Sequence, residues 1–394
     1  MILIDEKPWT QSGPGASQWS HLAKIAAVAA RDNALVGITN WTSVKFEDER
    51  VLIAGPVMDL EHNEICKSII EHPDVLLAFP LPPCNHYPWT TTELVAIESL
   101  KRIGGFDPQT RYQNVDQVLQ LAALRGVITN AYGWDRAWSG KHQLELKLAA
   151  WSRHTGRTLQ RPRTRIATGA ELKNIVAEFT MRGDICIVKP AHSSGGEGIQ
   201  IFSAGLEANL LPSDHYVVQE LLAHPLLLSS RKADVRFYVL LDPDMPESSS
   251  LVDPIFVRTC YDPYERGRLE SEITNTFQQV KRGNIPLIAP LEKANLPLHL
   301  KTVIREHASA LTSELLEAWQ WWHSVADIPV IPNRVFLWGA DLFISDSSSP
   351  DGLLLEVNTY PRLFRGVSEC DNLVENELLA SWMQRLKAKF SLRM

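Results

Sequence analysis

The chain has 394 residues, of which 45% are hydrophobic and 22% are charged, and these proportions are ordinary for a soluble globular protein. At roughly 100–200 residues per domain, this length predicts two or three domains. The formal net charge of −7 argues against a protein that binds nucleic acid non-specifically, because such proteins carry a basic surplus.

The five cysteines are widely spaced and form no Cys-x-x-Cys pair. This spacing predicts reduced thiols in a cytoplasmic protein rather than disulfides or a zinc site. Asp5 and Glu6 precede any apolar run, so the first residues do not resemble a signal peptide. The apolar stretches are too short to span a bilayer, and we therefore expect no membrane partner.

Residues 1–115 alternate short apolar runs with helical patches, which predicts a small N-terminal α/β lobe. The expected strands and helices of this lobe are strands 2–4, 35–38, 51–54 and 75–79 and helices 19–30 and 93–102.

Residues 116–228 are expected to form a central lobe. Five arginines lie between Arg153 and Arg165, and this basic run is either a solvated linker or, together with Arg362 and Arg365, a site for an acidic substrate. The elements expected in this lobe are helices 115–125 and 142–153 and strands 185–188, 199–202 and 215–219.

Residues 229–394 are expected to form a C-terminal lobe. A long helix is predicted at 300–322, because Leu311, Leu315 and Trp319 lie along one of its faces at four-residue spacing. The strands expected around it are 236–241, 336–344 and 353–357.

A loop rich in glycine and serine follows the strand that ends at Lys189. The lysine precedes the glycines, so the loop is not a Walker A motif. Glycines allow the backbone to approach closely and to aim N–H groups at anionic oxygens, which suits a flap over phosphates. A plain β-hairpin is the alternative. The candidate cofactor-binding residues here are Lys189, Ser194, Gly195, Gly196, Gly198 and Ile199.

An apolar strand at 217–222 runs into a less regular segment. Such an edge can offer backbone N–H and C=O groups to adenine, although an ordinary core strand is the alternative. The candidate residues are Gln219, Glu220, Leu221 and Leu222.

Charged residues alternate with apolar ones along 232–241. Because a strand has a two-residue repeat, Lys232, Asp234 and Arg236 lie on one of its faces. Three charged groups are costly to bury without partners, so this pattern favours a charged cleft over core packing.

Two further strands each carry oxygen ligands. Asp341 lies inside an apolar strand, and Glu356 and Asn358 lie two residues apart on one face of another. Two carboxylates and an amide oxygen are the hard ligands that magnesium takes. Polar residues bonded to backbone at strand ends are the alternative.

Taken together, these motifs resemble the tubulin–tyrosine ligase-like branch of the ATP-grasp superfamily over roughly residues 140–365. Glu272 opens a run in which that family more often has histidine. The residues that carry the resemblance, in the family's order, are Lys189-Pro190, Gln219, Lys232, Asp234, Arg236, Arg258, Thr274-Asn275, Asp341 and Leu355-Glu356-Val357-Asn358.

The resemblance implies an α/β (α+β) ATP-grasp fold with ATP in a cleft between the central and C-terminal lobes. It also implies that main chain at 220–222 holds adenine and that Arg236, Arg258 and Lys232 have catalytic roles at the transferred phosphoryl group. The remaining implied contacts are ATP with Lys189, Lys232, Asp234 and Asn275, and magnesium with Asp341, Glu356 and Asn358.

The implied activity is an ATP- and Mg²⁺-dependent ligase that joins a carboxylate to an amine through an acyl-phosphate. Its substrates would be an amino acid and a peptide or protein carboxylate. Two alternatives remain open from the residues alone: a kinase that phosphorylates a hydroxyl of a small molecule, and a non-catalytic ATP-binding scaffold.

Overall fold

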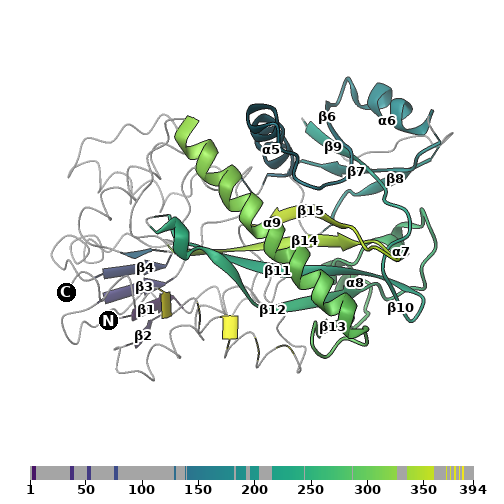
Figure 1. Ribbon diagram of the computed structural model, residues 1–394. Coiled ribbons are helices and arrows are strands. Elements are labelled where there is room, and N and C mark those ends of the chain that lie inside the picture. Colours follow the sequence, from purple (N-terminus) through teal and green to yellow (C-terminus); the bar gives the residue numbers. More distant parts are fainter. Residues whose placement is uncertain are drawn as a thin grey trace.

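The structure is a computed structural model of the chain, and it contains mixed helices and sheets (Figure 1). The expected helices at 19–30, 93–102 and 115–125 lie outside the described residues. Described are 140–181, 183–191, 196–203, 215–243, 245–285, 287–325 and 335–358, with Trp138, the backbone of five short strands before it, and isolated positions between 370 and 385.

The first sheet is parallel, with strand order β2-β1-β3-β4-β5. Its first four strands agree with the expected ones to within about a residue at each end, because short apolar runs bounded by polar residues define them. The bounds are β1 Ile2–Asp5, β2 Val36–Thr39, β3 Val51–Ala54, β4 Val75–Ala78 and β5 Ile128–Thr129.

The second sheet is antiparallel, has the order β6-β9-β7-β8, and is called the smaller sheet below. Helix α6 (Leu172–Thr180) buries Leu172, Ile175 and Phe179 in the same apolar cluster as residues of this sheet. The strands are β6 Thr164–Thr168, β7 Cys186–Pro190, β8 Gln200–Phe202 and β9 His215–Glu220.

The third sheet, called the larger sheet below, has the order β13-β12-β11-β14-β15, with β10 also paired to β11. Its pairs are antiparallel. The strands are β10 Leu227–Leu228, β11 Arg231–Leu241, β12 Ser250–Thr259, β13 Leu287–Pro290, β14 Phe336–Ile344 and β15 Gly352–Asn358. The short helices between them are η3 Pro246–Ser248, α7 Leu269–Glu272 and α8 Thr276–Lys281.

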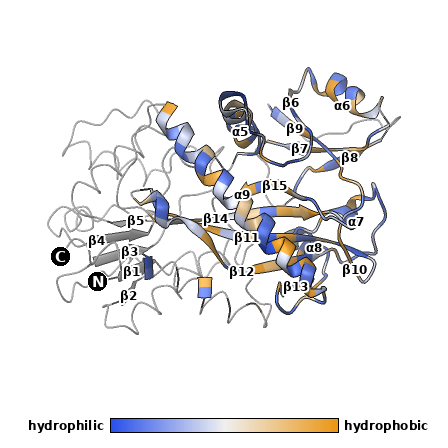
Figure 2. Ribbon diagram, viewed as in Figure 1, coloured by the Kyte–Doolittle hydropathy of each residue, from blue (hydrophilic) through white to orange (hydrophobic). Residues whose placement is uncertain are grey.

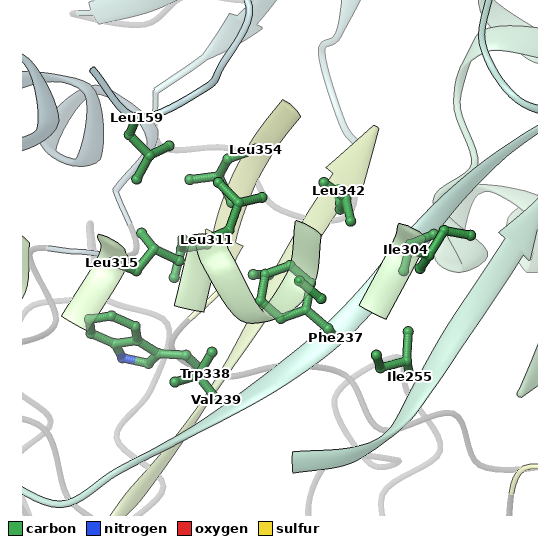
Figure 3. Packing of buried hydrophobic residues seen from close by; sticks show 14 of the residues in the cluster. Leu159, Phe237, Val239, Ile255, Ile304, Leu311, Leu315, Trp338, Leu342 and Leu354 are labelled. Atoms are coloured by element: carbon green, nitrogen blue, oxygen red, sulfur yellow. The ribbon is translucent and has the colours of Figure 1, made fainter. Parts of the chain in front are cut away.

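Helix α9 (Leu298–Val325) crosses one face of the larger sheet (Figure 1). Leu311 and Leu315 of this helix pack with Phe237 of β11 in one apolar cluster (Figure 3). Polar and apolar residues alternate around α9, as expected for a helix with one buried side (Figure 2). The apolar face of the larger sheet is therefore covered, and its opposite face is left for polar groups.

Helix α5 (Lys141–Thr155) connects the two antiparallel sheets. Leu148 and Trp151 belong to the apolar cluster under α9, while other parts of the helix contact β6 and β9 of the smaller sheet. The helix ends at Gly156, whose left-handed backbone lets its N–H donate to the carbonyl of Ser152. None of the described helices has the length and apolarity that a membrane crossing requires.

Strands β12 and β13 and helix α6 are not among the expected elements. In β12, Asp253 and Pro254 interrupt the apolar pattern of the strand. The register between β11 and β12 shifts at this point, and such an irregularity is where a strand tolerates proline.

The basic run is largely neutralised within the chain, while Arg362 and Arg365 lie outside the described residues. The ion pairs of the run are Arg157 with Glu317, Arg161 with Glu145, Arg163 with Asp184 and Arg165 with Glu178. Four of the five arginines of the run thus have acidic partners within the chain.

The contact between α9 and β15 predicts an effect on stability. A Cβ atom added at Gly352 would lie 2.5 Å from Cγ and 2.7 Å from Cβ of His307, so the helix would have to shift. We expect Gly352→Ala to lower the free energy of unfolding by about 1–3 kcal/mol, measured by urea denaturation. Gly140→Ala, where the nearest atom lies at 3.4 Å on a flexible side chain, is the control. Equal stabilities of the two variants would contradict the prediction.

Candidate functional site

The polar face of β11 carries three buried charged side chains, Lys232, Asp234 and Arg236. The two-residue repeat of the strand separates them from Val235 and Phe237, which pack in the cluster under α9. The three charged residues predicted to share one face of the strand do so. Each of its members has a partner of opposite charge on a neighbouring element.

Arg258 of β12 is the cross-strand neighbour of Asp234. Its Nε and Nη2 each donate to one carboxylate oxygen of Asp234, both at 2.7 Å. Nη2 also lies 3.0 Å from Oδ1 of Asp341 on β14. This two-pronged geometry suits a guanidinium and could not be reproduced by lysine.

Arg236 of β11 makes a second bidentate contact, to Asp341 on the neighbouring strand β14. It is in register with Asp341, and its Nε and Nη2 donate to Oδ1 and Oδ2, the latter at 2.9 Å. Burial by itself would raise the pKa of Asp341. The guanidiniums of Arg236 and Arg258 outweigh that effect and hold the pKa well below its ordinary value, so the carboxylate stays ionised.

Glu356 of β15 is in register with Asp341, and the two carboxyl groups are in hydrogen-bonding contact. Two adjoining carboxylates are favourable for a cation between them. Nδ2 of Asn358 donates to Oε1 of Glu356 at 3.0 Å, which places the amide beside the pair. Two carboxyl groups and an amide oxygen fit magnesium by their chemistry. Among the described residues, no group of three or more histidine, cysteine, aspartate or glutamate side chains is placed to hold a metal ion.

Lys189, at the end of β7, is the buried cation of the smaller sheet. Its Nζ donates to the neutral amide oxygen of Gln219 at 2.7 Å, and Nε2 of Gln219 donates to Thr164 at 3.1 Å. Burial lowers the pKa of Lys189, and among nearby charges Glu356 opposes this most strongly. A buried ammonium held by a neutral group is a ready site for an anion.

Two site residues were missed in the sequence, Lys141 and Glu145, which lie one turn apart at the start of α5. Burial lowers the pKa of Lys141, and Glu356 again opposes the shift. Burial raises the pKa of Glu145, against the effect of Arg161 and Lys189. A lysine at a helix start is too common to mark a site, so only the position of α5 between the sheets reveals these two residues.

The glycine-rich loop is partly described, since Ser194 and Gly195 lie outside the described residues. Gly196 and Gly198 have φ values of 79° and 70°, in the left-handed region that favours glycine. A Cβ atom at Gly196 would lie 3.1 Å from Gln278 of α8. Ile199 immediately precedes β8 and is half-buried, so the loop ends where the smaller sheet resumes.

In the segment 220–222, which the resemblance assigns to adenine binding, two backbone N–H groups already have partners. The N–H of Glu220 donates to the carbonyl of Arg163 at 2.9 Å, and that of Leu221 donates to the carbonyl of Ile185 at 2.8 Å. These two donors are already satisfied within the protein. Any main-chain donor to a base from this segment therefore falls to Leu222 or beyond.

Residues after β12 complete the polar face. Lys232 donates to Glu272 at 2.7 Å, and the hydroxyl of Thr274 donates to Asp234. Asn275 is half-buried, and its Oδ1 accepts the N–H of Gln278 at 3.4 Å at the start of α8. Asn275 thus positions the helix against which Gly196 packs.

Removing Arg258 tests the energetic importance of the network. Arg258→Ala would leave Asp234 without its two-pronged partner, and we expect a loss of about 3–5 kcal/mol in the free energy of unfolding, measured by urea denaturation. Arg165→Ala is the control, because Arg165 and Glu178 are 55% and 52% exposed and their pair contributes under about 1 kcal/mol. Similar losses in both variants would refute this interpretation.

Comparison with known proteins identifies the region around the charged face. A model described as "Tubulin-tyrosine ligase family" matches residues 138–280. A probable beta-tubulin polyglutamylase of Tetrahymena thermophila is 36% identical over 115 residues, which cover 29% of this chain and 8% of that protein. Tubulin glycylase 3D of the same organism is 26% identical over 224 residues, covering 51% of this chain and 21% of that protein.

A human protein described as "Probable tubulin polyglutamylase TTLL2" is 27% identical over 205 residues, covering 49% of this chain and 34% of that protein. The chain thus spans well under half the length of these relatives. Asp341, Glu356 and Asn358 lie beyond the segment matched by the family model. The resemblance is confirmed for this part of the chain: residues 138–280 match the tubulin-tyrosine ligase family, and the relatives that align with the chain carry names from that family.

Proposed function

We propose that this chain is an ATP- and Mg²⁺-dependent carboxylate–amine ligase of the ATP-grasp fold. The observation that carries the proposal is the position of Glu356. Glu356 is in register with Asp341 across β14 and β15, and its Oε1 accepts from Asn358 at 3.0 Å. Helix α5, which carries Lys141, contacts β15, and of the nearby charges Glu356 does most to oppose the lowering of the pKa of Lys141 and of Lys189 by burial. Carboxylates that could bind magnesium, on β14 and β15, and lysines that could bind phosphate, on β7 and α5, therefore influence one another electrostatically.

Magnesium would be held by Asp341, Glu356 and Asn358, and when bound it would neutralise charge on the phosphates. Lys189 and Lys141 would face the same phosphates from the smaller sheet and α5. The glycine-rich loop would cover them with backbone N–H groups. The adenine edge would meet the main chain at Leu222, because the N–H groups of Glu220 and Leu221 have partners.

Arg236 and Arg258 supply the positive charge that phosphoryl transfer to a carboxylate requires. Asp341 and Asp234 hold both guanidiniums in place before any substrate binds, so they need little reorganisation during the reaction. The γ-phosphate would pass to the substrate carboxylate, with ADP as the leaving group. An amine would then displace phosphate from the acyl-phosphate and form an amide.

The acceptor class is suggested by the relatives, which are described as a tubulin glycylase and a probable tubulin polyglutamylase. We infer that the substrates are an amino acid and a carboxylate on a protein or peptide, joined in a peptide or isopeptide bond. Carboxyl-rich tubulin tails are the first acceptors to test.

A ligase predicts ADP and phosphate that form only when both substrates are present. We expect Glu356→Gln to lower this turnover by at least about 100-fold, because it removes a carboxylate from the metal set. Glu178→Gln, on the exposed side of α6, is the control and keeps full activity. Mass spectrometry of the acceptor after incubation with ATP, Mg²⁺ and pooled amino acids identifies the product. A stable phosphate ester without an amide would indicate a kinase, and wild-type activity in Glu356→Gln would contradict the proposal.

Burial of Lys189 predicts a pH dependence of nucleotide binding. Its pKa is lowered from 10.5, so the free protein loses the ammonium charge as pH rises through that lowered value. Bound phosphate favours the charged form. MgATP affinity should therefore fall with rising pH, and binding in the alkaline range should take up protons.

Isothermal titration in buffers of different ionisation enthalpy measures this uptake. Lys189→Arg should take up fewer protons, because a guanidinium stays charged throughout. MgATP binding by the wild type without proton uptake between neutral and alkaline pH would exclude Lys189 as a phosphate ligand.

A further inference from the structure

Glu272, the last residue of α7, is a buried carboxylate at the charged face. Its side chain is fully buried, and the side chain of its partner Lys232 is 10% exposed. A carboxylate in such surroundings is costly unless both of its oxygens have donors.

Both oxygens of Glu272 have donors. Oε2 accepts from Nζ of Lys232 at 2.7 Å, and Oε1 accepts the N–H of Gly267 at 3.0 Å. Gly267 lies in the loop 261–275, which also contains Glu272, and has a φ of 84°. The loop backbone therefore sets the position of the carboxylate, and the carboxylate in turn sets the position of the ammonium.

A second anchor keeps the loop in register with β11. The hydroxyl of Thr274, two residues after Glu272, donates to Asp234, two residues after Lys232. Two loop residues spaced two apart, Glu272 and Thr274, thus bond to two strand residues with the same spacing, Lys232 and Asp234. The N–H of Cys260 donates to the carbonyl of Lys232 at 2.8 Å and fixes the start of the loop against the same strand.

A lysine side chain is flexible, so a fixed carboxylate partner restricts the position of its ammonium strongly. Its ammonium sits on a stem of four flexible carbons and has three donors, of which Glu272 takes one. The charge of Lys232 contributes to lowering the pKa of Lys189 in the smaller sheet. The Lys232 ammonium therefore lies on the side of the larger sheet where the phosphates are proposed to bind. Ordering a free lysine when a ligand binds would cost side-chain entropy.

We propose that Glu272 is a positioning residue that holds the ammonium of Lys232 ready for the phosphate chain of a nucleotide without touching the nucleotide itself. The inference rests on the proposed function, since it concerns the same nucleotide site. A purely structural role, in which Glu272 only secures the 261–275 loop, would act independently of Lys232.

A double-mutant cycle separates these two roles. MgATP affinity is measured by isothermal titration for wild type, Glu272→Ala, Lys232→Met and the double variant. We expect Glu272→Ala to weaken binding about tenfold in the wild-type background and to have no further effect once Lys232 is methionine. Equal weakening in both backgrounds would overturn the proposal and assign Glu272 to the loop alone.

Glu272→Asp covers the case in which the alanine variant does not fold. It keeps the charge but withdraws the carboxylate from Lys232, so a positioning role predicts MgATP binding weaker by about three- to tenfold. Wild-type affinity in this variant would contradict the proposal. Glu270→Ala is the control, because Glu270 lies on the same helix, is 44% exposed and pairs with Arg268 at the surface.

The outcomes also separate the two levels of inference. A wild-type protein that fails to bind MgATP contradicts the proposed function, and with it the role of Glu272. A wild-type protein that binds MgATP while Glu272→Ala and Glu272→Asp bind equally well contradicts only the positioning role.

Discussion

The rest of the site depends on the pairing of two arginines with two aspartates inside the larger sheet. Arg258 lies against Asp234 and Asp341, and Arg236 lies against Asp341. Isolated charges at this depth would be prohibitively costly, and removal of one partner would leave another uncompensated. The four residues come from three adjacent strands, so strands β12, β11 and β14 must pair in the observed register for any of the charges to be tolerated.

This constraint explains why one strand can serve two purposes. The face of β11 that carries Phe237 and Val239 packs in the apolar cluster with α9, which stabilises the sheet. The opposite face presents fixed charges in defined positions. Because the apolar side is close-packed, the charged side chains are attached to a rigid backbone. A rigid arrangement of charges suits chemistry that relies on electrostatic preorganisation.

The second half of the site is brought in from outside the larger sheet. Lys189 comes from the smaller sheet and Lys141 from α5, the helix that contacts both. Glu356 opposes the lowering of the pKa of both lysines, so cations from distant parts of the sequence are influenced by the same carboxylate. The match to the tubulin-tyrosine ligase family ends at residue 280, so the carboxylates on β14 and β15 lie beyond the segment that this match covers.

The sequence by itself determined the features that repeat locally. The alternation of charged and apolar residues in β11, the length of β14 and the apolar side of α9 follow from periodicities of two and 3.6 residues. Tertiary structure alone decided which charges pair: Lys232 with Glu272, Arg258 with two aspartates, and the arginines of the basic run with their own acidic partners. Pairing joins residues far apart in the chain, and no local repeat encodes it. For the same reason Lys141 and Glu145 gave no signal in the sequence, since their role arises only where α5 packs between two sheets.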